Sequence, residues 1–77
     1  MEKIDLRILA DKWPSAIVSR DKIEDFTGGL ITSKYLANID SAGDKKGPQG
    51  RIRIGRKVAY LVSEFVKWLE ARAEILD

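Results

Sequence analysis

The chain of 77 residues contains no cysteine and no histidine. Without cysteine it forms neither a disulfide nor a thiolate metal site. Without histidine it lacks the commonest metal ligand and the commonest general base, so we expect no enzyme activity, no metal and no cofactor. No apolar run approaches the roughly 20 residues of a membrane-spanning helix. The first residues include acids where a secretory signal is basic and then apolar. We therefore expect a cytoplasmic protein with no membrane partner.

Positive charge is concentrated between Ser41 and Lys57. This stretch holds six of the 14 Lys and Arg residues and one acid, Asp44, so its net charge is +5, while the other 60 residues together carry −3. Its basic residues are Lys45, Lys46, Arg51, Arg53, Arg56 and Lys57. The asymmetry predicts a polyanionic partner, because basic side chains displace the counterions condensed on nucleic-acid phosphates. The alternative is a solvated basic loop that only keeps the chain soluble.

The beginning of the chain predicts a short helix. Apolar residues between Glu2 and Lys12 recur at helical spacing. Pro14 should end this helix, because the residue before a proline is disfavoured in the helical conformation. Trp13 is expected to cover one edge of the core, and the alternative is an anchor for a partner protein.

Two further short helices are expected on either side of a glycine pair. The first should run from about Arg20 to Phe26, with Ser19 as its N-cap and Gly28 and Gly29 at its end, since glycine adopts the left-handed conformation at least cost.

The second of these helices should run from about Ser33 to Ile39, with Thr32 as its N-cap. Leu36 and Ile39 would face the core, while Lys34 and Asn38, four residues apart, share a different face. Two short helices joined by a tight turn form a helix-turn-helix.

A β-hairpin is predicted next. Arg51 to Ile54 alternates between basic and apolar residues, as a half-buried strand does, and Lys57 to Tyr60 is a plausible return strand. A three-residue turn at Gly55 to Lys57 would pair Ile54 with Val58 and Ile52 with Tyr60. That register puts Arg51 and Arg53 on the outer face, so we predict it in preference to a two-residue turn.

A last helix is expected from about Glu64 to Ala73, with Ser63 as its cap. It carries a wide apolar stripe. Together with the hairpin it should supply five core residues, namely Ile52, Ile54, Tyr60, Phe65 and Trp68.

The order helix, turn, helix, basic hairpin, helix is that of a winged helix-turn-helix, in which the second helix of the turn enters the major groove. The segment VSRDKIEDFTGGLITSKYLAN, followed by IRIGRKVAYLVSEFVKWLEAR, also resembles the small excisionase and MerR-type winged-helix DNA-binding domains of phages and bacteria. The most telling part is Ile54 to Tyr60, then Ser63, then FVKWL, because those families follow a wing hairpin with a helix that contains a Trp-Leu pair. The resemblance covers about Val18 to Arg72.

The resemblance implies an α+β, mostly helical fold with one β-hairpin wing. Residues 1–14 would be an N-terminal helical extension and residues 15–77 the winged helix-turn-helix domain, within one compact domain. The protein would then be a sequence-specific double-stranded DNA-binding protein, either an excisionase-like protein of DNA recombination or a small transcriptional regulator. It would be nucleoid-associated, of prophage type, and able to recruit a recombinase or another larger partner.

The resemblance also assigns DNA contacts. The recognition helix, about 33–39, would present Ser33, Lys34 and Asn38 to the major groove. Asn38 suits an adenine edge, and Lys34 a guanine or a phosphate. The wing, about 45–57, would reach the backbone or a minor groove. The resemblance places Arg51, Arg53, Arg56 and Lys57 in or beside the wing as its contacts. Lys45 and Lys46, in the loop before the hairpin, are expected to add non-specific attraction to DNA.

Other classes of function remain as alternatives. An RNA-binding module is one, although no aromatic residues interleave with the basic stretch as base-stacking platforms require. A protein–protein interaction adaptor without DNA binding is another. An enzyme is the least favoured class. The acids Asp21, Glu24 and Asp25 lie at the start of the helix expected from Arg20 to Phe26, where acids usually serve to complement the helix dipole.

Overall fold

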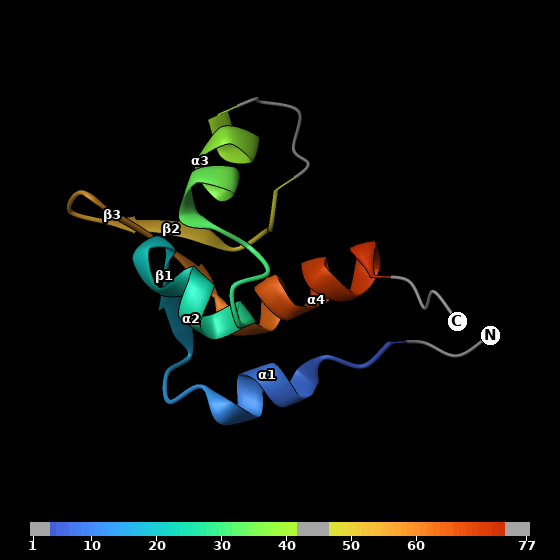
Figure 1. Cartoon of the computed structure of the whole chain (residues 1–77). Helices are drawn as coiled ribbons and strands as arrows, with labels where there is room; N and C mark the ends of the chain where they lie inside the picture. The colour runs from blue at the N-terminus through green and yellow to red at the C-terminus, as the bar shows by residue number, and fades with distance from the viewer. Residues whose placement is uncertain (1–3, 42–46, 74–77) are drawn as a thin grey trace.

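The structure, a computed structural model, describes residues 4–41 and 47–73. It is a small α+β fold built on a three-stranded antiparallel sheet with the strand order β1-β3-β2 (Figure 1). In chain order the elements are α1 (Arg7–Lys12), β1 (Ile17–Ser19), the 3-10 turn η1 (Arg20–Lys22), α2 (Ile23–Thr27), α3 (Ser33–Ser41), β2 (Arg51–Ile54), β3 (Lys57–Leu61) and α4 (Val62–Arg72). No helix within the described ranges is long and apolar enough to cross a membrane.

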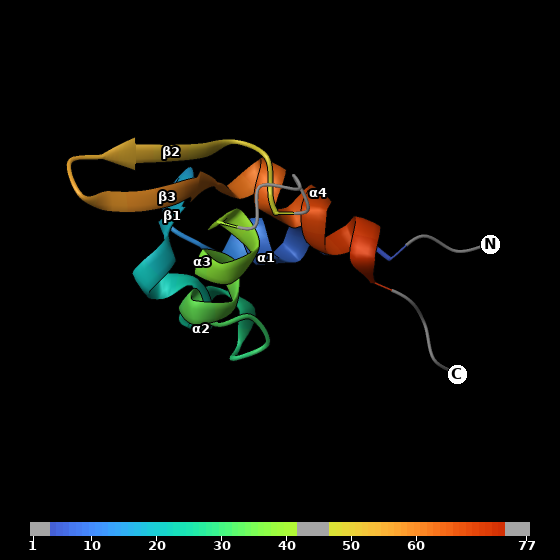
Figure 2. The same cartoon turned by 90° about the horizontal axis from the view of Figure 1, so that it is seen from above.

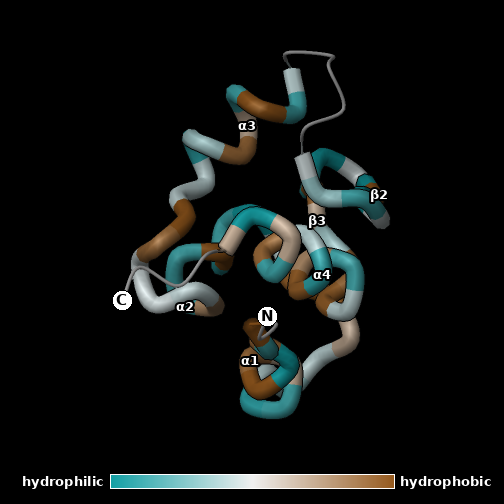
Figure 3. Tube along the Cα trace, turned by 90° about the vertical axis from the view of Figure 1, so that its right-hand side faces the viewer, coloured by the Kyte–Doolittle hydropathy of each residue, from teal (hydrophilic) through white to brown (hydrophobic). Residues whose placement is uncertain are grey.

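The helices α1 and α3 lie on opposite sides of the molecule, with β3 and α4 between them (Figures 1 and 3). The core is contributed by β1, α2, α3, β3 and α4, and its buried residues are Val18, Ile23, Phe26, Leu36, Tyr60, Val62, Phe65, Val66 and Leu69. Aromatic rings run through it in edge or tilted contacts. Phe65 meets Phe26 at 5.8 Å and Tyr60 at 5.6 Å between ring centroids. Such contacts add about 1 kcal/mol each to the burial of the rings.

The N-terminal segment packs against α4 as a short helix. It is shorter than the sequence predicts, because Leu6 precedes the first turn and its amide donates to Glu70 Oε2 at 2.7 Å. The helix ends before Pro14, as predicted. Trp13 covers an edge of the core, also as predicted: its ring meets Phe26 edge-on at 5.3 Å, and its indole N–H donates to the carbonyl of Ile17 at 3.0 Å.

The predicted helical corner is present, with one correction at its start. Ser19 makes no side-chain cap bond, because it is the last residue of β1 and pairs with Ala59; the chain then enters η1 before α2. Gly28 ends α2 in the left-handed conformation, with φ of 68°, as predicted. Thr32 is confirmed as the cap of α3, since its Oγ1 accepts the amide of Tyr35 at 3.1 Å.

The hairpin has the two-residue turn rather than the predicted three-residue turn. Ile54 pairs with Lys57, Arg53 with Val58, and Arg51 with Tyr60. Gly55, with φ of 63°, supplies the left-handed conformation that a two-residue hairpin turn requires. The prediction that Arg51 and Arg53 lie on the face opposite Val58 and Tyr60 is therefore wrong. The observed register is possible because Asp40 of α3 meets the charge of Arg51 on that face.

The last helix follows β3 without a break, so α4 begins at Val62 and Ser63 is not its cap. The amide of Val62 donates instead to the carbonyl of Ala16 at 2.9 Å. Phe65 and Tyr60 are buried and Trp68 packs against the core, as predicted. Ile52 and Ile54 were expected in the core as well, but Ile52 is only half-buried and outside the core cluster, and Ile54 is 65% exposed. The two-residue turn directs both to the face opposite Val58.

Candidate nucleic-acid interface

The exposed face of α3 carries Lys34 and Asn38. Both side chains lie one helical turn apart on the side away from Leu36, which is fully buried. Ser33 lies partly buried at the start of the helix, and the Ser41 hydroxyl donates to the carbonyl of Asn38 at 3.2 Å. Lys34 forms no ion pair with any residue in the described ranges. The helix therefore presents an amide, which both donates and accepts hydrogen bonds, beside an ammonium group.

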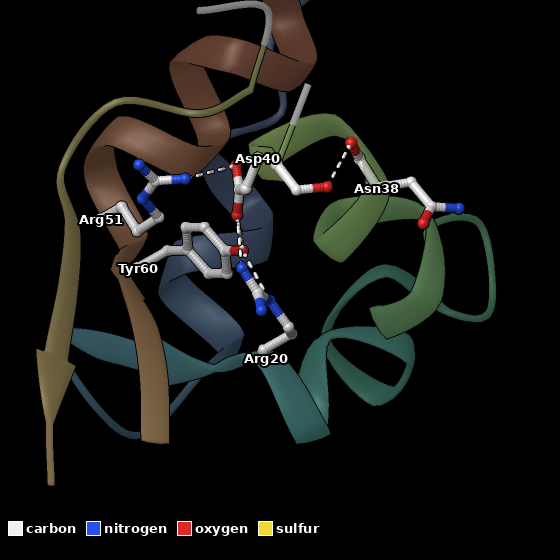
Figure 4. Close-up of polar contacts among 6 residues, drawn as sticks. Arg20, Asn38, Asp40, Arg51 and Tyr60 are labelled. Atoms are coloured by element: carbon white, nitrogen blue, oxygen red, sulfur yellow. Dashed lines mark hydrogen bonds and ion pairs between the residues drawn. The ribbon is translucent and has the colours of Figure 1, made fainter. Parts of the chain in front are cut away.

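The opposite flank of α3 is held by a polar cluster around Asp40. Its carboxylate is 6% exposed and accepts from the Tyr60 hydroxyl at 2.7 Å and from Arg20 Nη2 at 2.6 Å, both on Oδ2. Arg20 Nε donates to the Tyr60 hydroxyl at 3.1 Å, and Arg51 Nη1 lies 3.2 Å from Asp40 Oδ1. Figure 4 shows Asp40 directed toward Tyr60 and Arg20, while Asn38 points away from them.

This Asp40 cluster (Arg20, Asp40, Arg51 and Tyr60) joins α3 to η1, β2 and β3. Burial and the hydrogen bond to Asp40 raise the pKa of Tyr60 to about 12. Burial opposes the charge of Arg20, but its bonds to Tyr60 and Asp40 outweigh burial and raise its pKa. With one carboxylate between two guanidinium groups, the cluster keeps one net positive charge. It fixes the orientation of α3 relative to the hairpin, because each element contributes a hydrogen-bonding or charged partner.

A groove of about 420 Å³ separates α3 from the hairpin. Ala37, Asp40 and Ser41 line it from α3, Arg20 from η1, and Arg51, Ile52, Arg53 and Val58 from the strands. The Arg51 side chain is 48% exposed despite its contact with Asp40. Arg53 is exposed and forms no ion pair with a described residue. The groove therefore offers cationic side chains beside the exposed face of α3.

The hairpin tip, residues 53–57, is exposed at every position. Arg56 has no ion-pair partner among the described residues. Lys57 Nζ lies 2.7 Å from Asp21 Oδ2 with both side chains exposed, and their hydrogen bond raises the pKa of Lys57 and lowers the pKa of Asp21. Exposed pairs of this kind are weak, so Lys57 is readily available to an anionic partner.

Of the nine predicted contacts, Ser33, Lys34 and Asn38 lie on α3, Arg51 and Arg53 line the groove, and Arg56 and Lys57 lie with Arg53 at the hairpin tip. Lys45 and Lys46 fall outside the described residues. The sequence did not predict roles for Arg20 and Asp40. A signal was present for Asp40, because an acid in the last turn of a helix opposes the helix dipole and needs a cationic partner. Nothing local marked Arg20, which lies 20 residues away from Asp40 and 40 from Tyr60.

No protein-family model, curated protein or solved structure matches this chain.

Proposed function

We propose that this protein binds double-stranded DNA in a sequence-specific manner as a winged helix-turn-helix domain. The observation that carries the proposal is the juxtaposition of the exposed face of α3 with a groove lined by arginines and an exposed basic hairpin tip. A helix that is anchored on one flank and presents Asn38 and Lys34 on its free face suits insertion into a major groove.

In this binding mode Asn38 contacts an adenine edge, where an amide both donates and accepts. Lys34 reaches a guanine or a phosphate, and Ser33 a phosphate near the start of α3. In these assignments the base contacts specify the DNA sequence, while the phosphate contacts set the position of the protein on the duplex.

The groove and the hairpin tip supply phosphate contacts. Arg51 and Arg53 contact the DNA strand that lies along the groove between α3 and β2. Arg56 and Lys57 reach the next phosphates of the DNA backbone or the adjacent minor groove. Lys45 and Lys46 add non-specific attraction. Arg20 contributes indirectly, because it holds Asp40 and thereby the angle of α3.

The resemblance to excisionase and MerR-type domains gives this binding two biological settings, prophage excision and transcriptional regulation, both at the nucleoid. In either setting a small domain acts by occupying DNA or by recruiting a larger protein such as a recombinase.

The experiment that tests the proposal is fluorescence anisotropy at low salt with three labelled probes: duplex DNA, single-stranded DNA and duplex RNA. Duplex DNA should bind most tightly, because the major groove of A-form RNA is too narrow for side chains to read. Single-stranded DNA should bind weakly, because the basic stretch carries no stacking platform. Equal or tighter binding of RNA would favour an RNA-binding module, and binding of no probe would favour a protein–protein adaptor.

A further inference from the structure

An apolar cavity of about 370 Å³ is lined by the segment before α1, the connection between α2 and α3, α3 itself and the last turns of α4. It shares no lining residue with the groove between α3 and the hairpin. Its apolar walls are Leu6, Leu30, Ile31, Trp68 and Leu69. Figure 3 shows a hydrophobic stretch, in brown, in the connection between α2 and α3, and Figure 2 shows this connection standing out from the two helices. The volume falls in the range of about 300–1,000 Å³ that small-molecule sites occupy.

Two polar side chains from different helices meet at this cavity. Arg72 Nη2 of α4 donates to the Tyr35 hydroxyl of α3 at 3.4 Å. The guanidinium carbon of Arg72 also lies 4.8 Å from the centroid of the Trp68 ring, within cation–π distance. Arginine carries five N–H donors, more than these two contacts use, and a tyrosine hydroxyl both accepts and donates. Since Arg72 and Tyr35 are both exposed, the two groups stand at the open side of the cavity.

The charge of the cavity indicates the kind of ligand that fits it. Arg72 is the single charged residue of the lining, so the cavity carries one positive charge and no acid. The neighbouring Glu70 is engaged elsewhere, because its Oε2 accepts the amide of Leu6 at 2.7 Å. An apolar space with a guanidinium and a phenol at its mouth matches a molecule with an apolar body and one carboxylate. Arginine binds carboxylates in a planar, bidentate geometry, and such charge-assisted hydrogen bonds are about twice as strong as neutral ones.

We propose that this cavity binds a small carboxylate that carries an aromatic ring or a short apolar chain. The carboxylate lies on Arg72 and the Tyr35 hydroxyl, and the apolar body packs against Trp68, Ile31 and the buried Leu69. The volume is near the lower end of the range for ligand sites, which favours a small molecule. No lining residue is among the proposed DNA contacts, so this site is an addition to the proposed function and does not depend on it.

The test uses 3-phenylpropionate as the probe and 3-phenylpropanamide, an uncharged analogue of the same shape, as the control. Each is titrated without DNA into the isotope-labelled protein, and the indole N–H of Trp68 is followed by NMR. The acid should bind with a dissociation constant of about 1 mM, as expected for a ligand with few atoms. The amide should bind about tenfold more weakly, because it lacks the charge that Arg72 recognises. The indole N–H of Trp13 lies outside the cavity, where it donates to Ile17, and its signal should not shift.

Three variants separate the contacts. Arg72→Gln removes the charge but keeps part of the stem, so it should weaken binding of the acid about tenfold and leave binding of the amide unchanged. Tyr35→Phe keeps the ring and should weaken binding of the acid by about fivefold or less. Lys12→Gln removes the same charge from an exposed position of α1 outside the cavity and should change neither affinity. Because the acid and the amide are compared on each protein, a general loss of structure does not produce a selective loss of the acid.

Equal binding of the acid and the amide, or equal effects of Arg72→Gln and Lys12→Gln, would overturn the carboxylate site. The proposal also fails if the Trp68 signal stays unmoved up to about 10 mM of the acid. It fails as well if that signal moves with protein concentration alone, because a second copy of the chain would then cover the cavity. These results leave DNA binding untouched, since the assay contains no DNA and the proposed function is tested separately by anisotropy.

Discussion

The hydroxyl of Tyr60 donates a 2.7 Å hydrogen bond to Asp40 Oδ2, and this contact ties the central strand of the sheet to the last turn of α3. Arg20 completes the arrangement by donating to both groups. Because Asn38 lies on the same helix but on the opposite flank, the cluster that holds α3 leaves the exposed face unobstructed (Figure 4). In the proposed binding mode, one side of α3 therefore serves stability and the other side serves DNA recognition.

Replacing the carboxylate should destabilise the fold. Asp40→Asn leaves the guanidinium of Arg20, whose side chain is 23% exposed, without its anionic partner. We expect a loss of about 2 kcal/mol in the free energy of unfolding, since hydrogen bonds to charged groups contribute about that much. Urea unfolding measures it. Asp21→Asn, in the exposed pair with Lys57, is the control and should leave the unfolding midpoint unchanged. Equal effects of the two substitutions would remove the structural role of Asp40.

Alkaline pH should weaken the fold through Tyr60. Burial and Asp40 raise the pKa of Tyr60 from its ordinary value of 10.0 to about 12, so the folded state keeps the proton more firmly than the unfolded state. The resulting stabilisation is complete below pH 10 and is lost as the pH rises through 12. Urea midpoints measured across this window should fall more steeply for the wild type than for Tyr60→Phe. Parallel curves would show that Tyr60 does not titrate with a raised pKa.

Removing two groove and tip arginines should change the salt dependence of DNA binding. The double variant Arg53→Ala with Arg56→Ala should weaken binding to all sequences, and the log–log slope of affinity against salt should become shallower by about 2. Arg7→Ala with Lys12→Ala removes the same charge from α1, which lies on the other side of the molecule, and should alter the slope far less (Figure 1). Indistinguishable slopes for the two double variants would exclude the hairpin as the phosphate contact.

Truncating Asn38 should change sequence preference more than affinity. After a preferred site has been selected from random duplexes, Asn38→Ala should lose about 1–3 kcal/mol of discrimination at one base pair, as expected for a bidentate contact. Its affinity for non-specific DNA should stay close to that of the wild type. Arg53→Ala provides the contrast, because it should weaken all sequences alike. A uniform loss with Asn38→Ala would show that this side chain does not read a base.

The sequence predicted those features of the fold that depend on residues close together in the chain. Gly28 ends α2 and Thr32 caps α3, because a left-handed glycine and a capping hydroxyl act within a few residues of themselves. Trp13 on the core edge followed from its place beside Pro14 in an amphipathic segment. These features hold the corner that carries Lys34 and Asn38, so the exposed face of α3 was predictable.

The features that the sequence did not predict depend on residues far apart in the chain. The hairpin register was predicted from apolar alternation alone, which placed Ile54 beside Val58. That reasoning assumed that an arginine beside buried Tyr60 would be unfavourable, and it did not include Asp40 as a partner across the groove. Because Asp40 was not considered as a partner, the role of Arg20 and the exposure of Ile54 were not predicted either.

The decisive measurement is an amide NMR titration of the labelled protein with a short random DNA duplex at low salt. If α3 and the hairpin bind DNA, the shifts will be concentrated at Ser33 to Asn38 and in the basic stretch from Lys45 to Lys57, while α1 stays unmoved. A spectrum that duplex DNA leaves unchanged, or shifts confined to α1 and α4, would contradict DNA binding by this face and would leave the basic stretch as a solvated surface.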